Sequence, residues 1–321
     1  MCVDVLVLGA GVSGLTTAVC LAEAGLAVTL RSRDRPGETT SCAAGAIWGP
    51  YLVDDERVTA WAEQTRSVLE GLARTGRSTG VRLCHGMEAA RARVGPPAWA
   101  RALPDFRCGD PAELPEGFAS GWWYTAPVVD MPTYVAYLQD RFSRAGGVIE
   151  IRPVESLRDA AALAPVTVNC TGFWARDLVP DPAVSPTRGQ VVVVDNPGIN
   201  TFFVQYDESP QSTYFLPHGD HLVLGGNAEP GSDQLTPDLE VAAAIQRRCA
   251  AVEPSIATAR VRAHRVGLRP SRAAVRLEAT VVDGGRYLIH NYGHGGAGVT
   301  LSWGCANEVL GLVSALLTTR A

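Results

Sequence analysis

The first thirty residues place apolar runs and small residues in the order strand, helix, strand. Residues 3–8 are apolar except for Asp4, which is typical of a strand buried on both faces of a parallel sheet. The apolar spacing predicts a helix over residues 13–24, ended by Gly25, and a second strand over residues 26–30. Together these elements predict a βαβ unit.

Later segments contain further helical and strand patterns, and also a region of short strands that alternate with turns. Further helices are predicted over residues 55–74, 131–145, 236–252 and 300–317, and further strands over residues 148–154, 166–172 and 287–290. The strands at 148–154 and 166–172 are expected to rejoin the first sheet. Between residues 188 and 226 short strands alternate with turns, which indicates an antiparallel sheet. Residues 75–129 are less periodic, and we assign them to that second lobe.

The predicted fold class is α/β. A Rossmann-like dinucleotide-binding lobe is joined to a second, α+β lobe that is built on a mainly antiparallel sheet. A chain of 321 residues, 46% of them hydrophobic, can bury the core that such an arrangement requires.

A glycine motif, Gly9-Ala10-Gly11-Val12-Ser13-Gly14, lies between the first strand and the first helix. Gly9 allows the tight turn, Gly11 lets the backbone approach a pyrophosphate, and Gly14 lets the helix pack closely on the strand. The amides and dipole of the helix N-terminus favour phosphate binding. Because strands lie before and after the motif, dinucleotide binding is favoured over an ordinary glycine turn.

The end of the second strand commonly carries an acid that binds the adenosine ribose. Here the chain reads Arg31-Ser32-Arg33-Asp34. Asp34 could be that acid, Arg33 could stack on or hydrogen-bond the adenosine, and the arginines are equally compatible with an NADP phosphate. These residues leave the choice of dinucleotide open.

Composition and charge exclude several classes of function. A net charge of −5 provides no broad basic field, so no nucleic-acid partner is expected. No apolar segment is expected to reach the length of a membrane span, and no charged leader precedes the first strand. All 28 basic residues are arginine. Without lysine no Schiff base can form, so pyridoxal-phosphate chemistry is excluded.

The eight cysteines form no CxxC motif and no Cys/His cluster. We therefore predict neither a metal site nor a dithiol redox centre. One disulfide among them remains open, but their scatter favours a reducing, cytoplasmic environment.

Seven motifs together resemble one family, the FAD-dependent D-amino-acid oxidases. They are Gly9-Ala-Gly11-Val-Ser-Gly14, Ala43-Ala-Gly45-Ala-Ile-Trp48, Asn169-Cys-Thr171-Gly172, Arg188-Gly-Gln190, Tyr214-Phe-Leu-Pro217, Gly267-Leu-Arg269-Pro270 and His290-Asn-Tyr-Gly-His-Gly-Gly296-Ala-Gly298-Val-Thr300. The last two are the most specific, since they join a substrate arginine to a flavin loop in the order typical of the family. The resemblance covers essentially the whole chain and implies FAD, not NADP.

The resemblance also implies a discontinuous FAD-binding domain. It would comprise residues 1–74, 130–181 and 265–321, with residues 75–129 and 182–264 forming the substrate-binding domain. The expected cofactor contacts are Gly9, Ala10, Gly11, Val12, Ser13, Gly14, Arg33, Asp34, Thr39, Thr40, Ser41, Gly45, Ala46, Ile47, Val154, Thr171, Gly172, Gly295, Gly296, Gly298, Val299 and Thr300. The start of the last helix is expected to bring amides and the Thr300 hydroxyl to the pyrimidine edge of the flavin.

Three residues are predicted to bind the substrate. Arg269 can form a bidentate, charge-assisted pair with a carboxylate, whereas Arg272 and Arg276 are expected in structural ion pairs. Tyr214 would donate a phenolic hydrogen bond to the same carboxylate, although a strand tyrosine is by residue type more often a core residue. By resemblance, the carbonyl of Gly296 accepts a hydrogen bond from the substrate amine.

The implied reaction is oxidative deamination of a D-amino acid. The α-hydrogen would leave as a hydride to flavin N5, the imino acid would hydrolyse to a 2-oxo acid and ammonia, and oxygen would be reduced to hydrogen peroxide. Three anchored substituents make the reaction selective for one enantiomer. The resemblance to the family implies that this is the D-enantiomer. His294 is expected to be structural and not a general base.

Two departures from the family concern the substrate side chain. Relatives that oxidise acidic D-amino acids tend to carry an arginine after the Leu-Gly-Gly strand, where this chain reads Gly225-Gly-Asn227-Ala228-Glu229. Glu229 would repel a second carboxylate there, so neutral side chains are expected to be preferred over D-aspartate. The short loop over residues 207–213 lacks the tyrosine lid of some relatives, which predicts an open pocket.

The sequence leaves several alternatives open. D-Aspartate oxidase and glycine oxidase share the superfamily, while the missing lysine argues against a sarcosine oxidase. From other classes, a flavin dehydrogenase and a non-catalytic dinucleotide-binding redox sensor remain. The expected partners are a D-amino acid and oxygen, with a homodimer left open.

Overall fold

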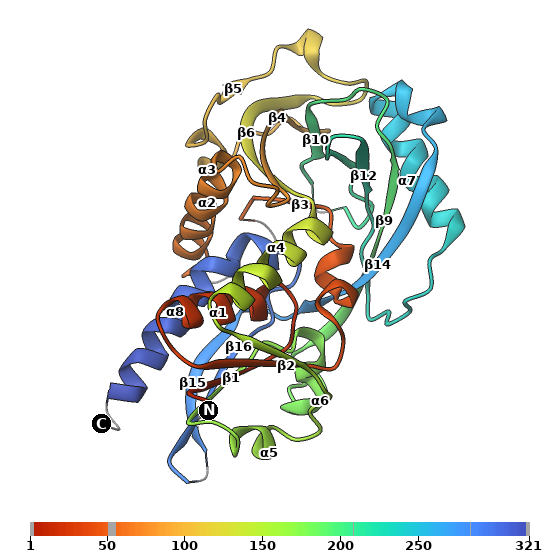
Figure 1. The fold of residues 1–321 in the computed structure, drawn as a ribbon. Coiled ribbons are helices and arrows are strands. Elements are labelled where there is room, and N and C mark those ends of the chain that lie inside the picture. The colour runs from red at the N-terminus through yellow and green to blue at the C-terminus, as the bar shows by residue number, and fades with distance from the viewer. Residues whose placement is uncertain (1–2, 51–55, 208, 283, 319–321) are drawn as a thin grey trace.

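The chain folds into two lobes, each built on one β-sheet (Figure 1). The computed structural model describes residues 3–50, 56–207, 209–282 and 284–318. Its helices are α1 (Val12–Glu23), α2 (Val58–Arg74), α3 (Ala98–Arg101), α4 (Met131–Arg144), α5 (Leu157–Ala161), α6 (Ala175–Leu178), α7 (Leu239–Val252) and α8 (Gly298–Thr318). The predicted helices thus correspond to α1, α2, α4, α7 and α8. Position 55, at the predicted start of α2, lies outside the described residues.

The first sheet is the predicted parallel one. Its order is β15 (Arg276–Val282), β16 (Arg286–Tyr292), β8 (Val166–Asn169), β1 (Val5–Leu8), β2 (Val28–Ser32) and β7 (Val148–Ile151). Neighbouring strands are parallel from β16 to β7, and β15 pairs antiparallel with β16. The prediction that strands after α4 rejoin this sheet is confirmed, while β15 is an addition that the sequence pattern did not indicate.

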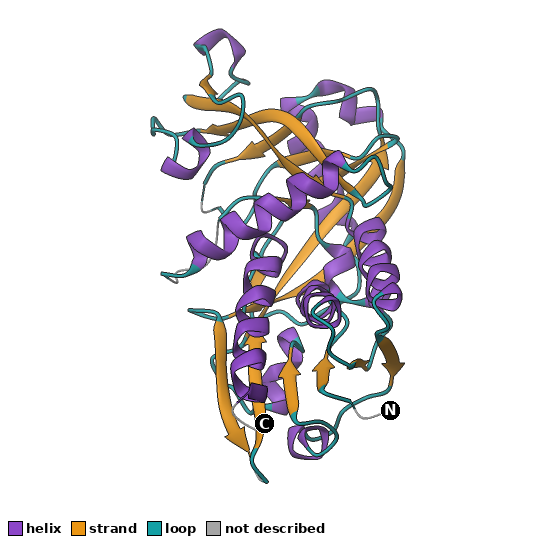
Figure 2. Ribbon diagram, turned by 60° about the vertical axis from the view of Figure 1, so that its left-hand side comes forward, coloured by secondary structure: helices purple, strands orange, loops and turns teal. Residues whose placement is uncertain are grey.

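Strand β1 is buried on both faces, as its apolar run predicted. Val5 and Val7 pack into the main core with residues of α1, whereas Leu6 and Leu8 pack against Ala160 near α5. Successive side chains of a strand point to opposite faces, so helices must cover both sides of this sheet. Figure 2 shows the short strands of this sheet, seen in the lower half of the view, with helices beside them.

The second sheet is mainly antiparallel, as predicted. Its order is β13 (Glu229–Pro230), β9 (Ser185–Asp195), β12 (His221–Gly225), β11 (Tyr214–Pro217), β10 (Phe202–Gln205), β4 (Val81–Ala90), β6 (Ser120–Val129) and β3 (Ala46–Ile47). In addition, β14 (Val261–Ser271) pairs with β9, and β5 (Arg107–Cys108) pairs with β6. The pair β4–β10 is parallel, and the other described pairs of this sheet are antiparallel.

The long strands β4 and β6 lie in the segment whose sequence showed little periodicity. The last five residues of β4 and the last four of β6 are all buried, so neither half-strand alternates between apolar and polar residues. The alternation signal requires one solvated face. The structure therefore places two ten-residue strands where the pattern only indicated membership of the second lobe.

Strand β14 carries the chain from the second sheet towards the first. An added Cβ at Gly267 would lie 3.1 Å from the side chains of Thr40 and Ala43, so glycine lets β14 pass close to the loop after β2. β14 continues in the second sheet to Ser271 and so crosses the expected domain boundary after residue 264. The division into domains stays a prediction.

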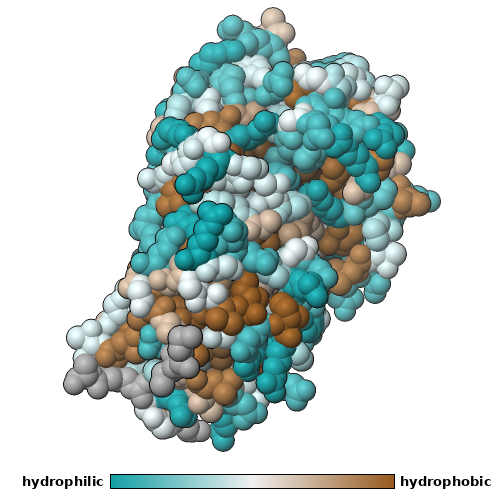
Figure 3. Space-filling view, in the orientation of Figure 1, coloured by the Kyte–Doolittle hydropathy of each residue, from teal (hydrophilic) through white to brown (hydrophobic). Residues whose placement is uncertain are grey.

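Helix α8 corrects one expectation from the sequence. It is 21 residues long with a mean hydropathy of 1.3, so by length and composition it could span a membrane, contrary to the prediction that no segment would. Half of the most apolar window is buried inside the protein, and the helix packs against α1 and α2. Figure 3 shows apolar residues at the surface of the lower lobe, where Figure 1 places α8. Burial among helices accounts for its apolar sequence.

Candidate functional site

The glycine turn after β1 is sterically closed to larger residues at two positions. Gly9 has φ +98°, and an added Cβ would lie 2.5 Å from the carbonyl oxygen of Cys170, which follows β8. An added Cβ at Gly14 would lie 1.9 Å from the Gly9 oxygen. Glycine is therefore required for β1, α1 and β8 to meet at this edge of the sheet.

The N-terminus of α1 faces the loop that follows β2. Its N-cap residue, Gly11, has no side chain that could cap the helix. The hydroxyl of Ser41 accepts a hydrogen bond of 2.9 Å from the Val12 amide, and an added Cβ at Gly11 would lie 3.1 Å from the same oxygen. The structure thus brings the glycine motif and the predicted contact Ser41 together around one helix N-terminus, which is suited to bind an anion.

Other predicted cofactor contacts lie on the same loop and on β3. Thr39 and Thr40 belong to the two turns over Pro36–Glu38 and Thr40–Ala43 and their junction. Ala46 and Ile47 form β3, which pairs with the end of β6 in the second sheet. This stretch therefore connects the first sheet to the second one.

Arg33 and Asp34 follow β2 and bind each other. The Arg33 Nε and Nη2 atoms donate to the Asp34 carboxylate at 3.1 and 2.8 Å. Both side chains are partly exposed. The pair uses the charge of both residues, so Arg33 is not an unpaired cation available for an NADP phosphate.

Thr171 and Gly172 lie at the carboxyl end of β8, next to Gly9. The Thr171 hydroxyl donates to Asn169 Oδ1 at 2.7 Å, and Gly172 has φ +57°. Val154 lies after β7 and packs with Leu6 and Leu8 on the α5 side of the sheet. Its contact with the cofactor stays a prediction.

The glycine loop before α8 is tied to β14. The amide of Gly295 donates to the carbonyl of Pro270 at 3.0 Å, so the predicted amine-binding residue Gly296 lies two peptide bonds and one hydrogen bond from Arg269. This loop includes Gly298 and Val299 at the start of α8. The structure therefore brings the two most specific sequence motifs together.

Two side chains of this region are bonded within the protein. His294 Nε2 lies 3.1 Å from Asn291 Oδ1, and burial lowers the pKa of His294 to about 4. A neutral, buried histidine fits the structural role that the sequence suggested. The Thr300 hydroxyl donates to the Gly49 carbonyl at 3.1 Å, so it anchors the loop after β3, and its contact with a flavin stays a prediction.

Tyr214, at the start of β11, lies against the loop that follows β2. An added Cβ at Gly45 would lie 3.2 Å from the Tyr214 hydroxyl, and one at Gly225 would lie 1.8 Å from its Cζ. Burial raises the pKa of Tyr214, and the positive charge of Arg269 partly opposes this shift. The phenol is thus within electrostatic reach of the predicted carboxylate clamp and remains protonated at neutral pH.

Arg269 lies on β14, with its guanidinium against the backbone of β9. An added Cβ at Gly189 would lie 2.6 Å from Arg269 Cζ, and Arg269 Nη1 donates to the Asn227 carbonyl at 3.0 Å. Among the described residues, no carboxylate forms an ion pair with Arg269. Its charge is therefore available to an anionic ligand.

Two nearby arginines are paired, as predicted. Arg272 and Arg276 both contact the Asp181 carboxylate, at 3.3 and 3.5 Å, and Arg276 also binds Glu278 at 2.7 Å. Arg272 and Arg276 differ from Arg269 because their positive charges are balanced by carboxylates within the protein and are less available to a substrate.

Glu229 corrects an argument made from the sequence. Its carboxylate binds Arg188 Nη1 at 3.0 Å and accepts a hydrogen bond from Asn227. The Arg188 side chain is only 3% exposed, so this contact neutralises the Glu229 charge. Repulsion by a free Glu229 carboxylate is therefore not the reason for any preference against acidic substrates. The Arg188 charge is equally occupied.

The loop over residues 207–213 is fixed to the segment after β12. The Gly226 amide donates to the Ser212 carbonyl at 2.6 Å, and the Ala228 amide donates to the Pro210 carbonyl at 2.7 Å. Position 208 lies outside the described residues. The loop sequence contains no tyrosine, and these bonds fix the position of the short loop. The open pocket stays a prediction.

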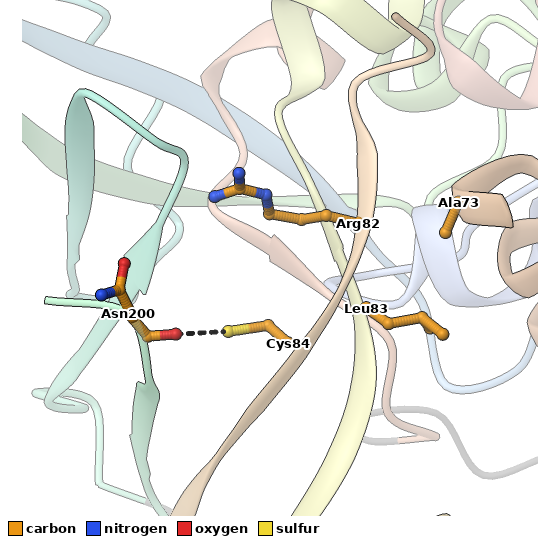
Figure 4. Close-up of a pocket in the computed structure, with 5 residues that line it drawn as sticks. All are labelled: Ala73, Arg82, Leu83, Cys84 and Asn200. Carbon is orange, nitrogen blue, oxygen red and sulfur yellow. Dashed lines mark hydrogen bonds between the residues drawn. The ribbon is translucent and has the colours of Figure 1, made fainter. Parts of the chain in front are cut away.

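One surface cavity lies away from these residues. It has a volume of about 460 Å³ and is lined by Ala73, Arg82, Leu83, Cys84 and Asn200. Figure 4 shows Arg82 and Cys84 on the side of Asn200, and Leu83 on the side of Ala73; the Cys84 thiol donates to the Asn200 carbonyl at 3.3 Å. None of the lining residues is a predicted contact, so this cavity does not mark the predicted site.

Several residues that build the site were not predicted as contacts. Gly189, Gly225 and Gly226 provide the backbone on which Arg269 and Tyr214 rest, and the Asn227 carbonyl holds the guanidinium. Arg188-Gly-Gln190 and Gly225-Gly-Asn227 were visible as motifs. Their role depends on strand register, which the sequence does not contain.

The residues present fit an FAD molecule. The glycine turn leaves backbone accessible where a Cβ would collide, the N-terminus of α1, whose N-cap residue Gly11 has no capping side chain, can bind a pyrophosphate, and the Arg33–Asp34 pair lies where the adenosine end is expected. Gly45 and the Gly295–Gly296 loop would lie beside the flavin ring. The described cysteines, with Cys2 outside them, are all free.

Comparisons with known proteins agree with this reading. Residues 4–311 match the model of the FAD dependent oxidoreductase family. The chain is 48% identical to a D-amino-acid oxidase of Rubrobacter xylanophilus over 97% of this chain and 96% of that protein. It is 50% identical to a D-amino-acid oxidase of Streptomyces coelicolor, over 97% of both chains.

More distant similarity covers the whole chain as well. A human D-aspartate oxidase is 33% identical over 96% of this chain and 94% of that protein. The crystal structure of glycine oxidase from Geobacillus kaustophilus has a TM-score of 0.83, with 21% identity over 97% of this chain and 94% of that one, which shows the shared fold. The chain belongs to the FAD dependent oxidoreductase family.

Proposed function

We propose that this chain is a D-amino-acid oxidase that acts on D-amino acids with neutral side chains. The observation that carries the proposal is that Arg269, which binds no described carboxylate, acts electrostatically on a half-buried, protonated Tyr214 that lies against Gly45 of the loop after β2. The names of the two bacterial relatives support the same activity.

Arg269 and Tyr214 bind the substrate carboxylate in this proposal. A guanidinium donates two parallel N–H bonds to a carboxylate, and the Asn227 carbonyl fixes one Nη atom from behind. The Tyr214 hydroxyl makes no hydrogen bond to another described residue, and its raised pKa keeps the proton that it donates.

Gly296 binds the substrate amine through its carbonyl. Because the Gly295 amide is bonded to Pro270, this acceptor is held in a fixed position relative to Arg269. With the carboxylate, the amine and the side chain all placed, the α-hydrogen of one enantiomer alone points along the remaining direction. Bound FAD would supply the acceptor for the hydride, with oxygen as the final two-electron acceptor and hydrogen peroxide as the product.

The preference for neutral side chains follows from the charges around Asn227. Arg188 is buried and bound to Glu229, Arg248 donates to the Gly226 carbonyl at 2.7 Å, and Ala228 stands where acidic-substrate relatives tend to carry arginine. A second substrate carboxylate would therefore lose its hydration without gaining an ion pair from Arg188 or from position 228. The imino acid that leaves the site hydrolyses in water to a 2-oxo acid and ammonia.

The test is an anaerobic titration of the purified protein, followed by its visible flavin absorption. D-Alanine should bleach the band and L-alanine should not, and glycine and D-aspartate should act weakly. Air should then restore the band and produce hydrogen peroxide. Bleaching only by glycine or D-aspartate would reassign the substrate, and failure of air to restore the band would indicate a dehydrogenase. A protein without any flavin band would contradict the proposal altogether.

Oxygen as acceptor, a cytoplasmic location and a homodimer belong to the same proposal. The free thiols of the described cysteines agree with a reducing compartment. Size-exclusion chromatography with light scattering will determine the number of subunits.

A further inference from the structure

An arginine is stacked on a tryptophan at the carboxyl edge of the first sheet. Arg33 follows β2, and its Cζ lies 3.9 Å from the ring centroid of Trp174. Trp174 ends the short turn Gly172–Trp174, which follows β8. Because β2 and β8 lie on either side of β1, the stack bridges the two strand ends that flank the glycine turn.

The N–H groups on one edge of the Arg33 guanidinium bind Asp34, and part of the side chain remains exposed to solvent. Nε and Nη2 donate to Asp34, and the Asp34 carboxylate balances the positive charge of Arg33. The Arg33 side chain remains 48% exposed, and Trp174 is 41% exposed, although large aromatic side chains are usually buried. What the pair offers a ligand is a flat, exposed surface and not an unpaired charge.

We propose that Arg33 and Trp174 form a stacking platform for the adenine of FAD. In a βαβ dinucleotide grip the adenosine lies beyond the end of the second strand, which is where Arg33 stands. Guanidinium and indole planes both stack on nucleobases. Trp174 is thus a proposed cofactor-binding residue that no motif identified. Arg33 would bind the adenine by stacking of its guanidinium plane and not by its charge.

The platform also explains the choice of dinucleotide. An NADP 2′-phosphate requires an arginine free to bind it, and here Arg33 is already bound to Asp34, whose carboxylate repels a phosphate. The residues that left the choice open in the sequence favour FAD once their contacts are known.

The experiment measures FAD release from the purified holoenzyme, by the rise in flavin fluorescence on dilution. Trp174→Ala should raise the FAD dissociation constant about tenfold, and Trp174→Phe, which keeps an aromatic plane, should stay close to the wild type. Arg33→Leu should weaken binding in the same direction. An unchanged dissociation constant in Trp174→Ala, or equal weakening in Trp174→Phe, would overturn the proposal.

Arg107→Leu is the matched control. Arg107 also stacks on a tryptophan, 5.2 Å from the Trp123 ring, and binds a carboxylate, Glu113. It lies in the second sheet, so its loss should leave FAD release unchanged; an equal effect would show that the variants act through general destabilisation and would contradict the platform. Since no substrate is present, the result is independent of whether D-alanine bleaches the flavin.

Discussion

The guanidinium of Arg269 lies directly against the backbone of Gly189, where an added Cβ would come within 2.6 Å of Cζ. This contact exists because β14 and β9 pair with Gly267 opposite Gly189. The position of the proposed carboxylate clamp is thus set by a residue that carries no functional group.

Gly189→Ala should displace the clamp without removing it. The Arg269 side chain is flexible enough to move, so the fold should persist while the guanidinium moves away from the backbone of residue 189. We expect KM for D-alanine to rise and kcat/KM to fall about tenfold, measured by steady-state peroxide formation. Gly71→Ala is the control, since an added Cβ there meets nothing within 4 Å. Equal kinetics in both variants would show that Gly189 does not position Arg269.

Tyr214→Phe should weaken substrate binding and leave the flavin in place. The variant keeps the ring that packs against Gly45 and Gly225 and loses only the hydroxyl. One hydrogen bond to a charged group contributes about 1.5 kcal/mol, so KM should rise about tenfold with a smaller change in kcat. If KM stays at the wild-type value, Tyr214 is a core residue, as strand tyrosines often are.

Stability should fall as the pH is lowered from about 6.5 to about 4. Burial lowers the pKa of His218, His290 and His294 to about 4, so between these pH values the unfolded chain binds more protons than the folded one. Each such histidine then reduces the free energy of unfolding by about 1.4 kcal/mol per pH unit. His221 acts with the opposite sign, because the Asp130 carboxylate 3.7 Å away raises its pKa.

His218→Phe tests this dependence away from the proposed site. Both ring nitrogens of His218 are buried without a described hydrogen-bond partner, so a phenyl ring can replace the neutral imidazole. Urea unfolding between pH 4 and pH 8 should show a shallower slope in the variant below pH 6.5 and parallel curves above it. Identical slopes over the whole range would mean that His218 is protonated in the folded state.

Glu229→Gln should destabilise the fold more than it changes catalysis. The substitution leaves the buried Arg188 guanidinium with neutral partners only, at Gln190 and two carbonyls. We expect the free energy of unfolding to fall by about 1–2 kcal/mol. Asp195→Asn, which breaks exposed pairs with Arg260 and Arg262, should have a smaller effect because water and salt screen it. The reverse order would contradict the assignment of Glu229 as the partner of a buried charge.

The sequence predicted the first sheet well for a physical reason. The strand before Gly9 is buried on both faces and reads as a continuous apolar run, and the glycine turn has few structural alternatives. The ends of β4 and β6 are buried too, but glycine, proline and aromatic residues interrupt them, so they gave no clear period. No apolar segment was expected to reach the length of a membrane span, whereas α8 does so by length and composition.

The site was predictable in its residue types and not in its contacts. Arg269 was distinguished from Arg272 by a motif, and the structure adds a physical distinction: Arg269 has no carboxylate partner among the described residues, whereas Arg272 is bound to Asp181. The seat of Arg269 on Gly189, like the stack of Arg33 on Trp174, joins residues that lie 80 or more positions apart. Only strand register and chain crossings decide such contacts.

The hydrogen bond between Gly295 and Pro270 has a consequence for substrate length. It links the two anchors of the proposed site, the Arg269 guanidinium and the Gly296 carbonyl, through adjacent residues, so their separation does not depend on how the two lobes move. An α-amino acid has one carbon between carboxylate and amine, whereas a β-amino acid has two. β-Alanine would place its amine one carbon further from its carboxylate, so we expect a fixed separation of the two anchors to favour α-amino acids.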